Sequence, residues 1–103
     1  MTINTPFWTY ENVRLSVNRY RADNSVAIQA WSDEEGPIAM LTVCLDDKCL
    51  EENESYVDTN NCPWVLDFIE SSGLGKRTGR IRASGYCVYQ AVKFNMKKIK
   101  EEA

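Results

Sequence analysis

Three segments of this chain alternate apolar and polar residues, and this pattern constrains the fold more than any other feature. The alternation runs through Glu11–Arg21, Val26–Trp31 and Tyr86–Asn95. Because successive side chains of a strand point to opposite faces, a period of two predicts strands with one buried face. The turn-forming residues 21–24 separate the first two segments. The sequence therefore predicts an antiparallel hairpin near the N-terminus and a further strand near the C-terminus.

Two more strands and one helix are expected between these segments. The run Ile38–Leu45 is apolar on both faces, which predicts a central strand that completes a meander, and a short strand is predicted around residues 56–57. Asn61 followed by Pro63 is typical of a helix start, and Gly73 of a helix end, giving a helix of about eleven residues. Its apolar stripe consists of Trp64, Val65, Phe68 and Ile69.

These elements predict one α+β domain over residues 1–103, in which about four to five antiparallel strands form a sheet with one α-helix packed on one face. Residues 1–10 are expected to form an N-terminal arm and residues 96–103 a charged C-terminal tail. The glycine-rich residues 73–85 are predicted to be a loop or the arm of an edge hairpin. No apolar run is long enough for a membrane span, so we expect a soluble, cytoplasmic protein without a membrane partner.

The residue types argue against catalysis and against a bound cofactor. The chain has no histidine, which excludes Cys–His and Ser–His nucleophile pairs within it. Its four cysteines are irregularly spaced, with no CxxC pair, so no metal site is predicted and free thiols are expected. We therefore expect a protein that is not an enzyme and that carries no cofactor.

The charges are sorted along the sequence, although the net charge is only -3. Residues 33–70 hold eleven carboxylates against the single cation Lys48, whereas residues 71–100 hold eight cations and no carboxylate. Sorting of this kind bears on the choice of partners rather than on the fold. The two blocks either face separate partners or lie side by side in the fold and largely cancel.

The acidic block contains a cluster with a specific interpretation. Duplex DNA carries one charge about every 1.7 Å of its axis, and closely spaced carboxylates on a rigid scaffold imitate that field. The candidate protein-binding residues are therefore Asp46, Asp47, Glu51, Glu52 and Glu54. The alternative is a loop whose charge only keeps the protein in solution.

The basic block offers a second candidate surface, for nucleic acid. Its cations would contact phosphates, with Tyr86 and Tyr89 nearby for stacking on bases. The candidate nucleic-acid-binding residues are Lys76, Arg77, Arg80 and Arg82. The alternatives are that these cations pair with the acidic block or are merely solvated. A third hypothesis is a dimerisation module that uses an edge strand and Trp31, and the oligomeric state stays open.

The C-terminal half resembles a family of small proteins of unknown function encoded on plasmids, phages and integrative elements of Firmicutes. The residues that carry this resemblance are Trp64-Val-Leu-Asp-Phe-Ile-Glu, Gly73-Leu-Gly, Thr78-Gly79-Arg80, Ser84-Gly85-Tyr86, Tyr89 and Phe94-Asn95. The resemblance implies a link to type II-A anti-CRISPR proteins. It further implies a non-catalytic inhibitor that binds the RNA-guided nuclease of a host type II CRISPR system and interferes with guide RNA loading or DNA binding. Its acidic residues would then compete with guide RNA.

Overall fold

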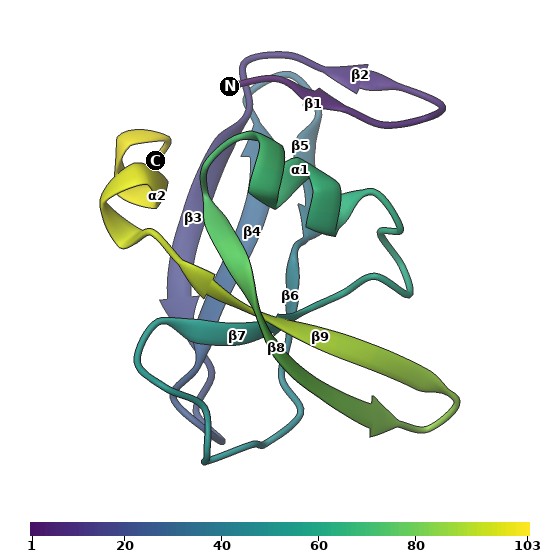
Figure 1. The fold of residues 1–103 in the computed structure, drawn as a ribbon. Coiled ribbons are helices and arrows are strands. Elements are labelled where there is room, and N and C mark those ends of the chain that lie inside the picture. Colours follow the sequence, from purple (N-terminus) through teal and green to yellow (C-terminus); the bar gives the residue numbers. More distant parts are fainter.

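The computed structural model describes residues 1–103 as nine strands and two short helices, arranged in three antiparallel sheets (Figure 1). The first sheet is a hairpin of β1 (Ile3–Asn4) and β2 (Thr9–Tyr10). The second has the order β3 (Arg14–Arg19), β4 (Val26–Ser32) and β5 (Gly36–Met40). The third has the order β6 (Thr42–Val43), β7 (Glu54–Val57), β9 (Cys87–Phe94) and β8 (Gly75–Ser84). The helices are α1 (Val65–Ser71) and α2 (Met96–Glu101).

The two predicted hairpin strands are confirmed as β3 and β4. Leu15 pairs with Ala30 and Val17 with Ile28, in the register that places the apolar residues on one face. The turn between them closes through a hydrogen bond of 2.9 Å from the Tyr20 amide to the Ser25 carbonyl. The α+β class is also confirmed, but the prediction of one sheet with one helix is wrong, because the strands divide among several small sheets and a second helix forms.

The apolar run Ile38–Leu45 is not one central strand. It is divided between β5, at the edge of the second sheet, and β6, at the edge of the third. Leu41 lies at the crossing point, where its amide donates to the Ile28 carbonyl and its carbonyl accepts from the Asp58 amide. The run is apolar on both faces because the chain passes from one sheet to the other through the core, where Leu41 is fully buried.

Helix α1 is shorter than predicted. Asp58 holds residues 59–62 in a turn by accepting from the Asn61 amide at 3.2 Å and, through its carbonyl, from the Cys62 amide at 2.9 Å. Asn61 therefore caps no helix, and the seven-residue α1 begins after Trp64 without a side-chain cap. Gly73, with φ of 74°, ends it as predicted. The buried face consists of Val65, Leu66, Phe68 and Ile69.

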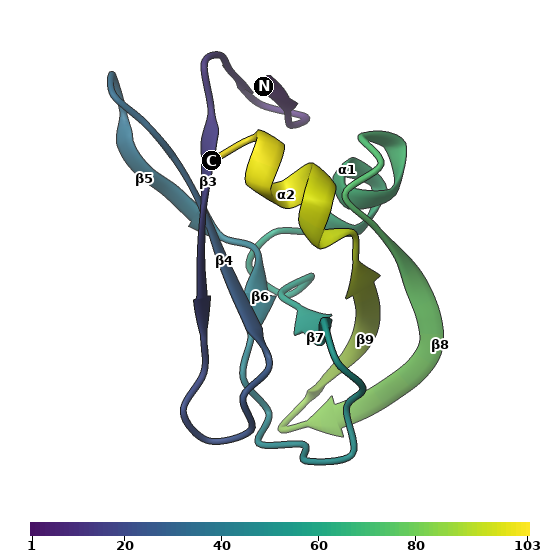
Figure 2. The same cartoon turned by 90° about the vertical axis from the view of Figure 1, so that its left-hand side faces the viewer.

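The C-terminal residues are packed onto the domain. The Asn95 side chain accepts from the Lys98 amide and starts α2, whose Ile99 is fully buried. The Glu102 carbonyl accepts from the Leu15 amide at 2.9 Å, which ties the end of the chain to β3. Figure 2 shows α2 between the second sheet and the β8–β9 hairpin.

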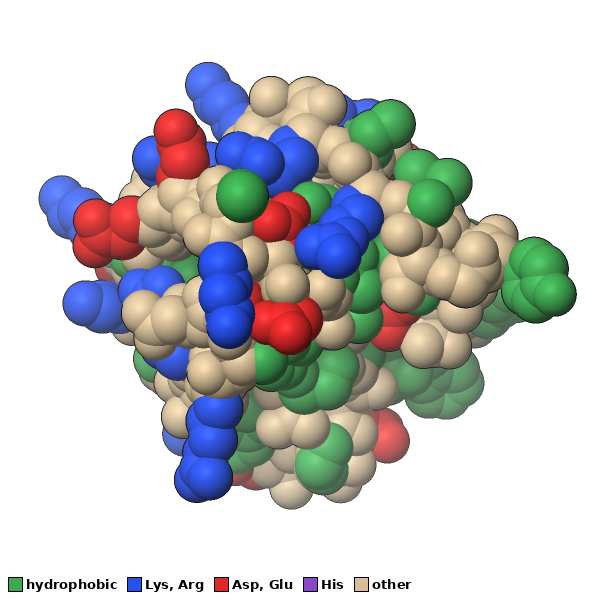
Figure 3. All heavy atoms as spheres, turned by 90° about the horizontal axis from the view of Figure 1, so that it is seen from below, with side chains coloured by type: hydrophobic (Ala, Val, Ile, Leu, Met, Phe, Trp, Pro, Cys, Tyr) green, Lys and Arg blue, Asp and Glu red, His purple; other side chains and the backbone are tan.

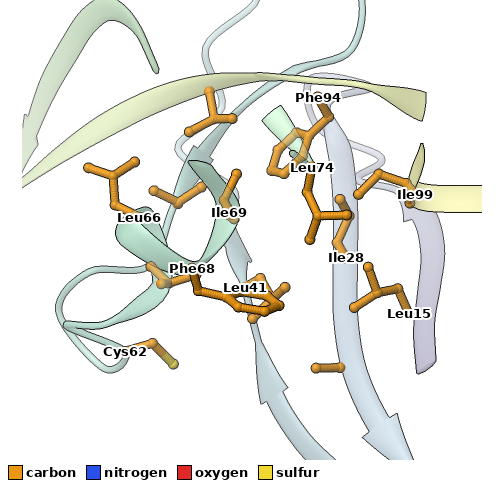
Figure 4. Packing of buried hydrophobic residues seen from close by; sticks show 14 of the residues in the cluster. Leu15, Ile28, Leu41, Cys62, Leu66, Phe68, Ile69, Leu74, Phe94 and Ile99 are labelled. Atoms are coloured by element: carbon orange, nitrogen blue, oxygen red, sulfur yellow. The ribbon is translucent and has the colours of Figure 1, made fainter. Parts of the chain in front are cut away.

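One hydrophobic core joins the second and third sheets and both helices. Leu15 and Ile28 from the second sheet point toward Ile69 of α1 and Phe94 of β9 (Figure 4). Beyond this core the β8–β9 hairpin extends as an arm (Figure 1). The arm places the basic block next to the loop that carries most of the predicted acidic residues.

Candidate functional site

The two charge blocks face each other in the fold. Arg80 lies 3.2 Å from Glu54, Arg82 lies 3.8 Å from Asp47, and Lys93 lies 3.7 Å from Glu51. These contacts join β8 and β9 to residues 46–54, which lead from β6 into β7. Figure 3 shows Lys and Arg side chains interspersed with Asp and Glu on this face, while hydrophobic side chains gather to one side. The sequence allowed the two blocks either to face separate partners or to lie side by side, and in the structure they lie side by side.

Glu54 is the centre of the contact, and only 2% of its side chain is exposed. Its carboxylate accepts from the Thr78 hydroxyl at 2.7 Å, the Glu51 amide at 2.9 Å and Arg80 Nε at 3.2 Å. Burial alone would raise the pKa of this carboxyl, but the hydrogen bonds and the Arg80 charge together lower it below its ordinary value. The charged form is therefore the stable one, and it links β7 to β8 across the intervening strand β9.

Asp47 forms a second contact of the same kind. Its carboxylate accepts from the Tyr56 hydroxyl at 2.6 Å and from the Cys49 amide at 3.0 Å. The hydrogen bond from Tyr56 lowers the pKa of Asp47, whereas burial and the neighbouring carboxylate raise the pKa of Tyr56 to about 12. We call Asp47, Glu54, Tyr56, Thr78, Arg80 and Arg82 the polar network.

The remaining predicted acidic residues are differently placed. Asp46 and Glu52 are exposed and form no ion pair, and Glu51 reaches only Lys93, with both side chains more than half exposed. We call Asp46, Glu51 and Glu52 the displayed carboxylates. The loop that carries them is anchored by the Glu51 amide on Glu54 and by the Asp47 amide on Asp23 at 3.2 Å. The five predicted residues thus separate into two that hold the loop and three that face solvent.

The four predicted basic residues are mostly occupied within the molecule. Arg77 donates to Glu70 through Nε at 2.9 Å and Nη2 at 2.6 Å, while Arg80 and Arg82 belong to the polar network. Lys76 alone is exposed without an ion pair. Three of the four predicted nucleic-acid contacts therefore already have a carboxylate partner in the fold.

Sequence reasoning missed Thr78 and Tyr56 as members of the polar network. Thr78 lies where the register between β8 and β9 shifts between Arg77 and Ile81, and this irregularity turns its hydroxyl onto Glu54. No sequence signal marks that bulge except Gly79, which has φ of 89°. Tyr56 could have been found from the sequence, because residues two apart in a strand share a face and Tyr56 follows Glu54 by two positions in β7.

Three further observations concern the cysteines, the metal-ligating side chains and the helices. Cys44, Cys49, Cys62 and Cys87 are all free, and burial raises the pKa of the Cys44 and Cys62 thiols, which keeps them protonated at neutral pH. No three His, Cys, Asp or Glu side chains lie together as ligands for a metal ion. Neither helix has the length and apolar character needed to cross a membrane.

The fold and the polar network define a small α+β protein whose acidic loop is held against a basic hairpin. The sequence model of the family described as Domain of unknown function (DUF4313) matches residues 14–103, and the chain belongs to this family. No curated protein and no solved structure matches the chain. The match covers both charge blocks, whereas the hairpin of β1 and β2 lies outside it.

Proposed function

We propose that this protein is a non-catalytic inhibitor, encoded on a mobile genetic element, that binds the RNA-guided nuclease of a type II CRISPR system. It interferes with guide RNA loading or DNA binding by occupying a basic nucleic-acid surface of the nuclease. The observation that carries the proposal is the set of displayed carboxylates. They lie within seven consecutive residues and face solvent. Asp46 and Glu52 form no ion pair, and Glu51 has only the exposed pair with Lys93 at 3.7 Å.

Anchoring makes these carboxylates suited to imitate phosphates. A flexible acidic loop loses conformational entropy when it binds, whereas a loop already fixed at its ends loses less. Here Asp47 and Glu54 hold the loop by hydrogen bonds to Tyr56 and Thr78. The contacts of Asp47 and Glu54 therefore fix the loop that presents the displayed carboxylates to solvent. Electrostatic complementarity to a basic channel of the nuclease then supplies both affinity and a fast association rate.

The choice of partner rests on the resemblance to proteins of mobile elements. Such elements meet the CRISPR defence of their host, and a small acidic protein that binds the nuclease protects them without chemistry of its own. The absence of histidine and the protonated state of the Cys44 and Cys62 thiols support a binding role.

Binding to the guide-free nuclease tests the proposal. The variant Asp46→Lys/Glu51→Lys/Glu52→Lys reverses the displayed carboxylates and leaves the carboxylates of Asp47 and Glu54 in place. The matched control Asp33→Lys/Glu34→Lys/Glu35→Lys makes the same change of net charge in the exposed turn between β4 and β5. We expect biolayer interferometry to show at least about a tenfold loss of affinity for the first variant and a much smaller one for the control. Equal losses would mean that only net charge matters and would refute mimicry.

A second candidate is binding of RNA or DNA by residues 76–82. Two observations favour it: Lys76 has no ion-pair partner, and Tyr86 is fully exposed at the tip of the arm. This function predicts salt-sensitive binding of a labelled single-stranded RNA, with the salt slope falling by about one unit in Lys76→Ala. If fluorescence anisotropy shows no binding at low salt, this second function is excluded.

A further inference from the structure

An open hollow of about 590 Å³ lies between the N-terminal hairpin and the α1 region. These two elements lie at the opposite end of the molecule from the loop between β6 and β7 (Figure 1). From the hairpin the hollow is lined by Thr2, Asn4 and Pro6, and from the α1 region by Pro63, Trp64, Asp67, Phe68, Ser71 and Ser72. The lining contains one carboxylate and no cation. We infer that this hollow binds an arginine or lysine side chain from an extended basic segment of a partner protein.

The charge at the hollow selects a cation. The Asp67 side chain is 94% exposed, and its nearest guanidinium nitrogen, on Arg77, lies 4.0 Å away. Arg77 itself is occupied by Glu70 at 2.6 Å. These three groups leave one net negative charge beside the hollow, and Asp67 is the more exposed and more loosely paired of the two carboxylates.

The aromatic wall suits a guanidinium. The Trp64 and Phe68 rings meet edge to face, with centroids 6.0 Å apart and planes at 71°, so Phe68 fixes the orientation of the half-buried indole. An arginine above such an indole gains a cation–π interaction. The protein already contains this pairing elsewhere, because Arg14 lies 5.3 Å from the ring centroid of Trp31.

The hairpin adds exposed anchors at the edge of the hollow. Phe7 and Trp8 directly follow Pro6 and are 94% and 60% exposed. Thr5 fixes their turn, since its hydroxyl accepts from the Trp8 amide at 2.9 Å and its amide donates to the Trp8 carbonyl at 2.8 Å. Below the turn, the fully buried Ile3 holds the hairpin to the core. Aromatic side chains held in place before binding are typical of the residues that dominate protein interfaces.

This inference does not rest on the proposed function, because the hollow and the displayed carboxylates share no residue. The probe is a fluorescein-labelled peptide of alternating glycine and arginine. Its controls are the same peptide with citrulline or with glutamate in place of arginine. We expect anisotropy to show binding of the arginine peptide, at least about tenfold weaker binding of the citrulline peptide, and none of the glutamate peptide.

Two matched variants locate the site. Asp67→Lys should weaken binding of the arginine peptide by about five- to tenfold or more, whereas Glu101→Lys, at an exposed acidic residue of the other helix, should leave it nearly unchanged. In NMR spectra the indole NH of Trp64 should shift on binding and that of Trp31 should not. Equal weakening by both variants, a shift confined to Trp31, or no binding at millimolar peptide would overturn the inference.

Discussion

Replacement of Glu54 by alanine tests whether the polar network holds the acidic loop and the β8–β9 arm together. The change removes the acceptor of hydrogen bonds from the Thr78 hydroxyl and the Glu51 amide. A hydrogen bond to a buried charged group contributes about 1.5 kcal/mol or more, so the two together give a loss of about 3 kcal/mol. Arg80 is 35% exposed and regains water in the variant, so it adds little to this figure.

The assay is urea unfolding followed by circular dichroism, with a thermal melt beside it. For a domain of this size, about 3 kcal/mol lowers the Tm by about 12 °C or more. Glu52→Ala is the matched control, because Glu52 is exposed and without an ion pair, and it should stay within about 0.5 kcal/mol of the parent protein. Thr78→Ala in combination with Glu54→Ala should show a coupling energy of about 1 kcal/mol. If Glu54→Ala proved as stable as Glu52→Ala, the network would not carry the stability assigned to it.

Three further predictions concern stability. Asp47 and Glu54 have lowered pKa values in the folded state, so the stability that their ionised forms contribute is present above the unfolded pKa values of about 4 and is lost as the pH falls through the folded pKa values. The urea midpoint should therefore be constant above about pH 5 and fall below about pH 4, and it should fall less in Glu54→Gln. Ile99→Ala should cost about 2–5 kcal/mol by urea unfolding, because Ile99 is fully buried, and a loss below 1 kcal/mol would mean that α2 is not docked in solution. Gly75→Ala should cost about 1–3 kcal/mol in the same assay, because its Cβ would lie 2.6 Å from Val92 Cγ1 and 2.8 Å from the Lys93 carbonyl oxygen; an unchanged midpoint would contradict that close approach.

The sequence patterns located individual strands but did not predict how these strands assemble into sheets. Alternation located β3, β4 and β9, since the period of two is set by the strand itself. It did not reveal that Leu41 divides one apolar run between two sheets. A residue buried at a crossing between sheets has the same composition as one in a central strand, and only long-range contacts distinguish the two.

The candidate site was predicted as a list of charges but not as an arrangement. Nothing local shows that Asp47 and Glu54 are neutralised by Arg82 and Arg80, because the pairing depends on the sheet order, in which β7 and β8 lie on either side of β9. The same limit applies to the helix start, where Asp58 captures the Asn61 amide and the expected cap does not form.

Plasmid cleavage by a type II RNA-guided nuclease, with this protein added before or after the guide RNA, tests the central claim most directly. If the displayed carboxylates occupy the guide-loading surface, the parent protein should block cleavage only when it is added before the guide RNA. If they occupy the DNA-binding surface, it should block cleavage in both orders of addition. The Asp46→Lys/Glu51→Lys/Glu52→Lys variant, although folded, should block it in neither order. Uninhibited cleavage by several such nucleases, or full inhibition by the charge-reversed variant, would contradict the claim.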